Sequence, residues 1–315
     1  MTNGSADCKP PEFASQPLTS SGLFLVLLTA ALWGATPVAA SFSLDSLPSF
    51  TVSGIRFGLA ALFMVGWCMV EKSRLVPVGE QWKYGIVSGL LLFVQISLFT
   101  FGVEYSNSSH TTLLINTYVF WVVVFEHFVT RTHLLNRSKL TGLLIAGAGA
   151  TLVTLLPVAA GDKQVDPSDQ ASIVGDLMLL GSGLVLAIKI IYVQQGLKKV
   201  PAGTLILWHD LVAVLLFLVA SLGWEMHDIE LADFTQPAIL GLLYQGFVVA
   251  GFCFAVQAML LKKHIASQIS IFSFSTPLFG LAAASLLRSD TLSPWLLLSA
   301  LLVALGIWMV QKRSR

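Results

Sequence analysis

The chain has 315 residues, of which 55% are hydrophobic and only 11% are charged. Soluble domains carry about 25% charged residues, so this chain has too little charge to cover a surface in water, which excludes a soluble enzyme, a disordered protein and a nucleic-acid binder. The net charge of +1 and the mean hydropathy of +0.79 leave an all-α, polytopic membrane protein that contacts membrane lipid and no nucleic acid.

The N-terminal residues 1–21 are rich in proline, serine and threonine, and we expect them to form a short disordered cytoplasmic tail. Beyond this tail, apolar runs of roughly 18–24 residues recur, and each is long enough to cross a hydrocarbon layer of about 30 Å. The sequence therefore predicts ten transmembrane helices, at 22–42, 50–70, 84–104, 110–130, 139–159, 172–194, 203–222, 237–260, 267–287 and 294–311.

Basic residues alternate between the two sides of this predicted arrangement. Of the 18 Lys and Arg, Arg56 and Lys189 fall inside spans, and Lys163 and Arg288 fall in loops on one side. All the others fall on the opposite side, in the two terminal segments or the remaining loops. Because cytoplasmic segments carry the excess of Lys and Arg, we expect a multi-pass protein of the plasma (inner) membrane with both termini in the cytoplasm.

The two halves of the chain resemble each other. Gly22 corresponds to Gly175, and Leu47-Pro48 corresponds to Val200-Pro201, with the same separation along the chain. Each half holds five predicted spans, and because five is odd, the second half enters the membrane from the other side. This predicts an inverted repeat, a common construction of secondary transporters. The predicted parts are the tail 1–21, a first five-helix repeat 22–160, an external linker 161–171 and a second five-helix repeat 172–315.

Short motifs follow a characteristic order along both halves. They are Ala31-Leu32-Trp33-Gly34, Gly54-Ile55-Arg56-Phe57, the segment Tyr105 to Ser109, Asn116-Thr117-Tyr118, Phe274-Ser275-Thr276-Pro277, Asp290, Ser293-Pro294 and Gly306. In this order they resemble the EamA family of the drug/metabolite transporter (DMT) superfamily, although Val119 and His133 stand where that family often has proline and glutamate. The resemblance implies ten helices, cytoplasmic termini and a central cavity between the halves for amino acids, metabolites or drugs.

Polar side chains inside the spans are the candidates for substrate contact, since polar groups in hydrocarbon need a partner or a wet cavity. The candidates for the cavity are Trp33, Thr36, Arg56, Gln95, Asn116, Tyr118, Tyr244, Gln245, Ser275 and Thr276. They come from both halves, as expected for a site at a repeat interface, although the neutral ones are equally suited to hydrogen bonds between helices. Pro37 and Pro277 are predicted to kink spans one and nine and to free backbone carbonyls.

Arg56 lies about 10 Å below the outer surface, by the rise of a helix, and its guanidinium has five donors to satisfy. It either anchors a carboxylate or phosphate of the substrate, or pairs internally with backbone carbonyls or with Glu104. Lys189 and Asp210 lie at similar depth on two spans joined by a short loop. They are predicted to form an ion pair with His209 beside it, as a structural clasp or as a proton-sensitive gate.

Glu126 and His127 lie near the inner end of span four. We expect both to extend to the cytoplasmic interface, and the alternative is a proton relay. The sequence contains no phosphate-binding glycine loop, no His-Glu-x-x-His zinc motif and no Gly-x-Ser-x-Gly elbow. We therefore expect no catalytic residue, metal site or cofactor, and transport energy must come from a gradient.

These features predict a secondary-active or facilitative transporter of a small metabolite, amino-acid-like or drug-like, and the resemblance implies export. One alternative is a lipid-linked carrier or flippase. Another is a membrane-embedded enzyme that uses Glu126, His127 or the His209–Asp210 pair. A small-molecule substrate and membrane lipid are the expected partners, and nothing in the sequence supports a homodimer, which stays open.

Overall fold

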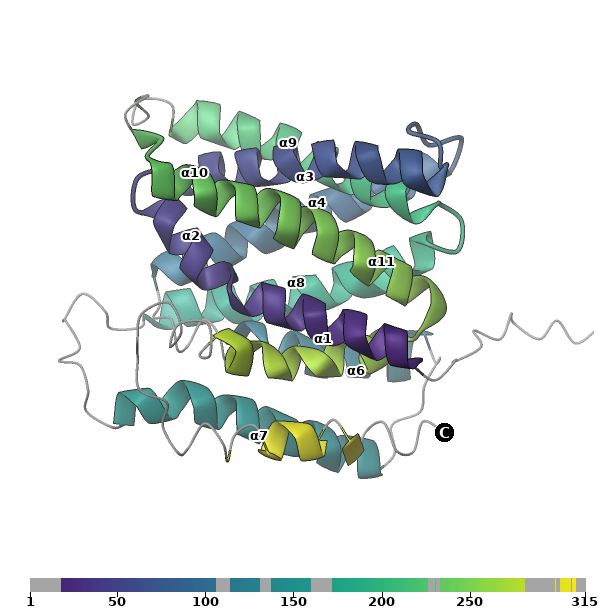
Figure 1. Cartoon of the computed structure of the whole chain (residues 1–315), viewed down its shortest axis with the longest axis vertical. Coiled ribbons are helices and arrows are strands. Elements are labelled where there is room, and N and C mark those ends of the chain that lie inside the picture. Colours follow the sequence, from purple (N-terminus) through teal and green to yellow (C-terminus); the bar gives the residue numbers. More distant parts are fainter. Residues whose placement is uncertain are drawn as a thin grey trace, which may run out of the picture.

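The computed structural model describes residues 18–105, 114–130, 137–159, 172–225, 230, 233–280, 298, 301–306 and 308–309. Within these ranges the chain is helical and has no strand, and the helices lie side by side in layers (Figure 1). The elements are α1 (Ser20–Gly34), α2 (Thr36–Leu44), α3 (Ser49–Glu71), α4 (Gln81–Glu104), α6 (Tyr118–Phe125), η1 (Glu126–Thr130), α7 (Arg137–Ala159), α8 (Ile173–Gly196), α9 (Ala202–Trp224), α10 (Gln236–Leu243), η5 (Tyr244–Cys253), α11 (Phe254–Lys263), α12 (Ala266–Ser270) and η6 (Ile271–Ser275).

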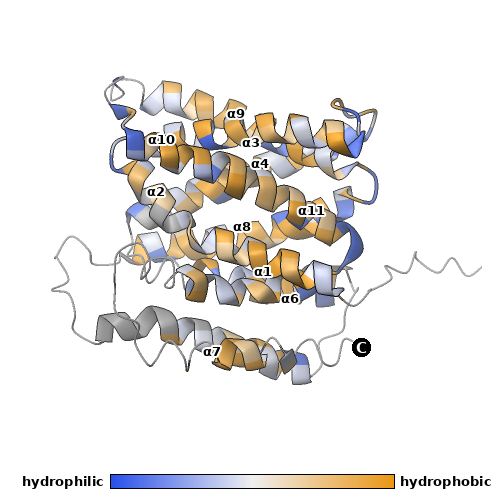
Figure 2. Cartoon of the chain, in the orientation of Figure 1, coloured by the Kyte–Doolittle hydropathy of each residue, from blue (hydrophilic) through white to orange (hydrophobic). Residues whose placement is uncertain are grey.

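Five helical segments of the described chain are long and apolar enough to cross a membrane. They are Ser49–Glu71, Gln81–Gly102, Ile173–Gly196, Ala202–Trp224 and Gln236–Lys263. Apolar residues cover their sides, while hydrophilic residues concentrate at the ends of the helices (Figure 2). Lipid offers no hydrogen-bond partners, so such a segment is stable in hydrocarbon as a helix, in which the backbone N–H and C=O groups bond to each other.

The predicted spans 50–70, 84–104, 172–194 and 203–222 each coincide with one uninterrupted helix, namely α3, α4, α8 and α9. Three other spans are not the single α-helices that the sequence suggested. Span one divides into α1 and α2, span four passes from α6 into the π-helix η1, and span eight contains the π-helix η5 between α10 and α11.

Several predicted segments fall partly or wholly outside the described residues. Most of the N-terminal tail, the linker 161–171 and the segment with Arg288 and Asp290 are among them. Span nine begins as α12 and η6 and continues as a helix through 276–280, and of span ten only 298, 301–306 and 308–309 are described.

Helices α3 and α9 form a reciprocal pair in which each helix caps the other. Glu225, which follows α9, accepts hydrogen bonds from the backbone N–H groups of Phe50 and Thr51 at the start of α3, both at 2.8 Å. Glu71, the last residue of α3, accepts one from the N–H of Gly203 at the start of α9, at 2.7 Å. The two helices therefore run antiparallel and are held at both ends.

The sequence explains why these two helices need outside caps. The residues that precede them, Pro48 and Pro201, provide no side-chain cap. The first N–H groups of a helix lack partners within the helix and favour negative charge. A glutamate from the opposite helix supplies both an acceptor and the charge.

Helices α1 and α8 also begin alike. Thr19 precedes α1 and its side chain accepts a hydrogen bond from the N–H of Gly22, and Ser172 precedes α8 and accepts one from Gly175. Hydroxyl side chains are favoured at this position because they satisfy an unpaired helical donor. The glycine pair that the sequence comparison matched thus occupies equivalent positions in the two helices.

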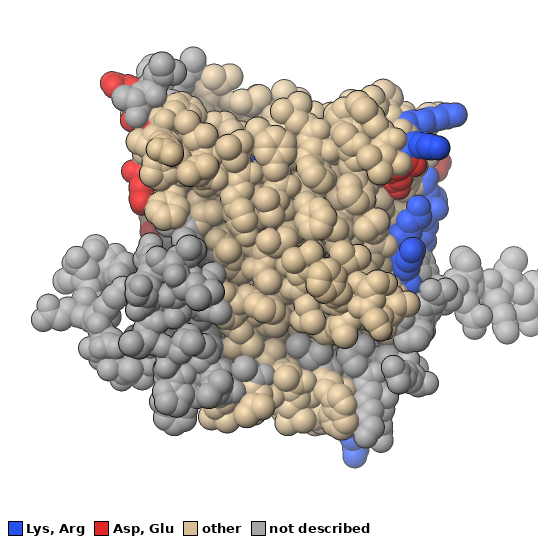
Figure 3. Space-filling view, viewed as in Figure 1, with Lys and Arg blue, Asp and Glu red and all other residues tan. Residues whose placement is uncertain are grey.

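Charged side chains divide between the two ends of the helices. Lys and Arg gather at the right-hand end in Figure 3, whereas the charged groups at the left-hand end are acidic. The exposed basic residues at the first end include Lys72, Arg74, Lys83, Lys198, Lys199, Lys262 and Lys263. The described acidic residues at the other end include Asp45, Glu104, Asp176, Glu225, Glu230 and Asp233. Between the two ends the visible surface carries almost no charge, as a lipid-facing belt requires.

Candidate functional site

Five polar side chains meet inside the helical bundle, and we call them the polar cluster: Arg56, Gln95, Lys189, His209 and Asp210. They come from α3, α4, α8 and α9. Lys189 is 5% exposed and Asp210 is fully buried, and Gln95 and His209 are buried as well. Charged groups at such a depth are rare because their removal from water is costly, and they commonly mark functional positions.

Gln95 connects α4 to α8 through both ends of its amide. Its Oε1 accepts a hydrogen bond from Lys189 Nζ at 3.2 Å, and its Nε2 donates to Ser182 Oγ at 3.2 Å. The Ser182 hydroxyl donates in turn to the backbone carbonyl of Gln95 at 2.9 Å. The amide therefore orients the ammonium group and fixes the two helices to each other.

Asp210 pairs with its neighbour His209, and not with Lys189 as the sequence suggested. The His209 Nδ1 and Asp210 Oδ1 atoms are 2.8 Å apart. No ion pair within 4.0 Å joins Lys189 to Asp210 in the described structure, although the two side chains interact electrostatically. The prediction of a direct Lys189–Asp210 pair is therefore wrong, because Gln95 holds the lysine and the adjacent imidazole holds the carboxylate.

Arg56 is partly buried on α3, and its Nε atom is buried without a hydrogen-bond partner. Its guanidinium carbon lies 5.2 Å from the centre of the Phe57 ring. Glu104 is exposed at the end of α4, and within the described residues no ion pair joins it to Arg56. The guanidinium instead interacts electrostatically with Asp210. The π-helix η5 packs closely against this stretch of α3, since a Cβ on Gly246 would lie 3.0 Å from the Arg56 carbonyl oxygen.

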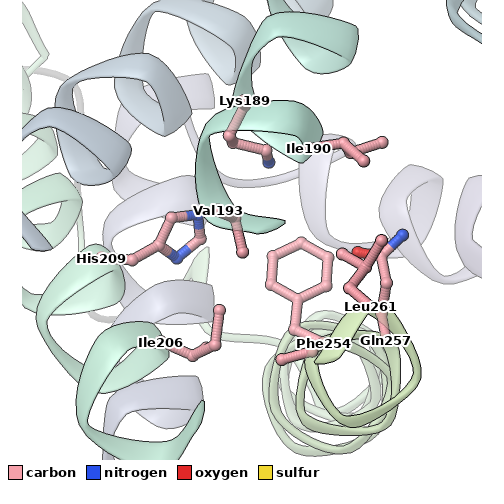
Figure 4. Close-up of a pocket in the computed structure, with 9 residues that line it drawn as sticks. Lys189, Ile190, Val193, Ile206, His209, Phe254, Gln257 and Leu261 are labelled. Carbon is pink, nitrogen blue, oxygen red and sulfur yellow. The ribbon is translucent and has the colours of Figure 1, made fainter. Parts of the chain in front are cut away.

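Phe254, the first residue of α11, connects the polar cluster with span one. Its ring centre lies 5.2 Å from Lys189 Nζ, 5.9 Å from the His209 ring, 6.3 Å from the Phe57 ring and 6.4 Å from the Trp33 ring. A small cavity of about 20 Å³ adjoins Lys189, His209, Phe254 and Gln257 (Figure 4). A space of this size admits about one water molecule.

The interruption of span one lies at Ala35, two residues before Pro37. Proline has no N–H to donate, so the helical hydrogen bonds end here. Span eight contacts both sides of this interruption, because Tyr244 Oη donates to the Leu32 carbonyl in α1 at 2.8 Å and Gln245 Nε2 donates to the Ala39 carbonyl in α2 at 3.3 Å. Thr36 Oγ1 is buried and has no partner among the described residues.

A second contact joins spans four and nine. The Tyr118 hydroxyl donates to Ser273 Oγ, and Phe120 packs edge-on against Phe274 at 5.7 Å. Asn116 is buried in the turn before α6. Of the predicted cavity residues on span nine, Ser275 donates to the Phe272 carbonyl of its own turn at 2.5 Å, and Thr276 is partly buried. The predicted kink residue Pro277 is buried.

The sequence suggested that Glu126 extends to the cytoplasmic interface, but in the structure its side chain is buried. It is 1% exposed, and its Oε1 accepts a hydrogen bond from the N–H of Ser267 at 3.0 Å. This contact joins the start of η1 in span four to the start of α12. His127 is partly buried beside it.

Of the predicted residues, Trp33 from the cavity group and Lys189 and His209 from the gate group lie around Phe254, a residue that the sequence did not single out. The amphipathic spacing on α8 contains a usable signal for Ser182, because it precedes Lys189 by two helical turns and so shares its face. No comparable local signal marks Phe254. In the parts of the chain that are described, no group of three His, Cys, Asp or Glu side chains is placed to hold a metal ion.

Comparison with known proteins places this arrangement in a family. The sequence model of the EamA-like transporter family matches the chain twice, at residues 20–155 and 173–311. Arg56 and Gln95 lie in the first matched segment, and Lys189, His209 and Asp210 lie in the second.

Individual relatives match almost the whole chain. An uncharacterized transporter of Bacillus subtilis, YoaV, is 25% identical over 285 residues, which are 90% of this chain and 94% of the relative. A protein of Salmonella typhimurium named "probable amino-acid metabolite efflux pump" is 25% identical over 295 residues, covering 91% and 93% of the two chains. A solved crystal structure shares the fold with a TM-score of 0.75 at 15% identity, covering 92% of this chain and 97% of the other. With its several apolar membrane-length helices, this chain is an integral multi-pass membrane protein and belongs to the EamA-like transporter family.

Proposed function

We propose that this protein is a secondary-active or facilitative transporter that exports a small amino-acid-like or drug-like metabolite. Transport proceeds by alternating access between two inverted five-helix halves, residues 22–160 and 172–315. The observation that carries this proposal is the polar cluster, because each half contributes buried ionisable or amide groups to one place inside the bundle. A transporter with internal repeats binds its substrate where the repeats meet.

Four further features support the paired halves. The family model matches each half separately, and the offset that relates Gly22 to Gly175 also relates Pro48 to Pro201 at the starts of α3 and α9. The reciprocal glutamate caps of α3 and α9 are what an antiparallel, two-fold related pair would contain. The interruption at Ala35 and the π-helix η5 lie next to each other, and broken helices line the sites of many transporters.

The name of the Salmonella relative supports an amino-acid-like substrate and outward transport. We propose that the basic end of the bundle lies in the cytoplasm with both termini, in the plasma (inner) membrane. The site then comprises the polar cluster together with Trp33, Thr36, Tyr244 and Gln245. Asn116, Tyr118, Ser275 and Thr276 contribute from spans four and nine.

Transport by the purified full-length protein in liposomes tests this function. We expect flux of some members of a panel of labelled amino acids, their derivatives and drug-like cations above that of empty liposomes, measured with and without a pH gradient. Lys189→Gln should abolish this flux, whereas the matched exposed variant Lys262→Gln should retain it. Absence of solute flux together with movement of labelled lipid between leaflets would identify a flippase and refute the proposal.

A further inference from the structure

The polar cluster contains more positive than negative charge. Arg56 and Lys189 both interact electrostatically with Asp210. With Arg56 and Lys189 protonated, Asp210 ionised and His209 neutral, the formal charge of the cluster is +1. The other buried acid of the described residues, Glu126, interacts with Ser267 and Lys139 in a different part of the bundle. A buried charge without a counter-charge is strongly unfavourable, so the cluster is incomplete as it stands.

The hydrogen bonds show the same deficit. Among the described residues, Arg56 Nε has no acceptor, and Lys189 Nζ donates to the neutral amide of Gln95. Asp210 is turned toward His209, and its Oδ2 atom has no hydrogen-bond partner within the same described part of the chain. Each cation rests over an aromatic ring, Arg56 over Phe57 and Lys189 over Phe254. Cation–π contacts offset only a small part of the desolvation cost of a buried cation.

We propose that the missing counter-charge is the carboxylate of the transported solute, bound by Arg56 and Lys189. This inference rests on the proposed function and specifies its substrate class as a small monoanionic or zwitterionic carboxylate. One excess positive charge matches a carboxylate, whereas a phosphate dianion would leave an excess of negative charge. The apolar part of the solute lies against the rings of Phe254, Phe57 and Trp33, which lie between the cluster and span one.

The cavity beside Lys189 provides space next to one of the two proposed ligands of the carboxylate, and Arg56 does not line it. Its volume of about 20 Å³ accommodates one oxygen-sized group and not a complete solute. It lies between α8, α9 and α11, so the bound state requires these helices to separate slightly. Movement of helices around a fixed charge is what alternating access provides.

Acetate binding to the detergent-purified full-length protein tests the charge assignment without knowledge of the solute. Thermal unfolding is measured against increasing acetate at constant ionic strength, with acetamide as the neutral isostere. Acetate should raise the unfolding temperature in a saturable manner, and acetamide should not. Arg56→Gln and Lys189→Gln should each weaken acetate binding about tenfold or more, since a hydrogen bond to a charged group contributes roughly 1.5–3 kcal/mol.

Two further variants separate this site from general charge effects. Asp210→Asn removes the competing carboxylate and should strengthen acetate binding, whereas Arg56→Gln and Lys189→Gln should weaken it. Lys262→Gln removes an exposed cation with the same change in net charge and should leave acetate binding as it is. If Arg56→Gln does not fold, Arg56→Lys serves in its place. This variant keeps the positive charge but lacks the paired N–H groups of the guanidinium, so it should bind acetate more weakly than the native protein.

The results also distinguish this inference from the proposed function. Equal effects of acetate and acetamide, or unchanged acetate binding in Lys189→Gln, would overturn the anion site. Liposome flux that is equal for amino acids and for their amides would overturn it while leaving the transporter intact. Specific acetate binding without any solute flux would retain the anion site and refute the transport function.

Discussion

Asp210 is the residue on which the charge of the interior depends. It is fully buried and is the carboxylate that opposes Arg56 and Lys189, while its Oδ1 atom contacts His209. Removal of one member of a buried charge group is costly because the remaining charges stay desolvated. The three side chains therefore have unequal importance: without Lys189 the cluster is balanced, whereas without Asp210 it holds two unopposed cations.

This inequality predicts the order of stability among variants. Asp210→Asn should destabilise the protein by about 3–5 kcal/mol and Lys189→Met by less. Adding Lys189→Met to Asp210→Asn should recover part of the loss, because the double variant returns to the original excess of one positive charge. Thermal unfolding in detergent measures each effect, with exposed Lys262→Met as the control. A double variant that is as unstable as the sum of the single ones would contradict the coupling.

At the scale of elements, the α3–α9 pair shows how two helices compensate for each other's sequence. Pro48 and Pro201 leave both N-termini without a side-chain cap, and Glu225 and Glu71 supply the missing acceptors from the opposite helix. Thr51 reinforces one end, since its hydroxyl donates to Glu225 Oε2 at 2.9 Å.

The caps can be tested one at a time. Glu225→Ala removes three hydrogen bonds and should lower the free energy of unfolding by about 1–2 kcal/mol, and Glu71→Ala should have a smaller effect. Glu80→Ala is the matched control, because Glu80 precedes α4 and forms no capping bond with its side chain. Urea or thermal unfolding in detergent distinguishes them, and an equal effect of Glu80→Ala would show that general charge, and not capping, is responsible.

Close helix crossings give a second test at this scale. A Cβ on Gly34 would lie 2.8 Å from the Gly280 nitrogen and the Thr276 carbonyl oxygen, so spans one and nine touch through their backbones. Gly34→Ala should therefore destabilise by about 1–3 kcal/mol. Gly66 on α3 is exposed and has no atom within 4 Å of its Cβ position, so Gly66→Ala should be neutral or slightly stabilising. The sign difference in thermal unfolding is the measurement, and similar effects at both positions would contradict the crossing.

At the scale of the whole molecule, the separation of charge defines an orientation. The basic end carries Lys72, Lys199 and Lys262, and the acidic end carries Glu104 and Glu230, with an uncharged belt between them (Figure 3). Because cytoplasmic segments of membrane proteins carry the excess of Lys and Arg, we expect the basic end to lie in the cytoplasm.

Cysteine labelling tests this orientation. In a Cys8→Ser background, where the described native cysteines Cys68 and Cys253 are buried, Glu230→Cys should react with an impermeant maleimide in right-side-out vesicles. Lys199→Cys should react only in inside-out vesicles. Labelling of both positions from the same side would refute the ten-span topology, and a reversed pattern would place the basic end outside.

The sequence alone determined the class of protein and the position of most membrane segments. Hydrocarbon requires runs of about 20 apolar residues, so spans such as α3, α8 and α9 are readable from local composition. The family was also readable, because its motifs occur in order along the chain and the family model matches both halves. Even the glycine and proline correspondences between the halves coincide with helix starts in the structure.

Only the tertiary structure decided which polar groups meet. Lys189 and Asp210 lie at similar depth, but Gln95, from a helix far away in sequence, binds the lysine, and His209 takes the carboxylate. Glu126 is buried because Ser267 from the other half offers it an N–H group. Hydropathy reports how deep a residue lies in the membrane, since that depends on its own neighbours along the chain. The direction a side chain faces and the partner it finds depend on helices packed from elsewhere, and these set the net charge of the interior.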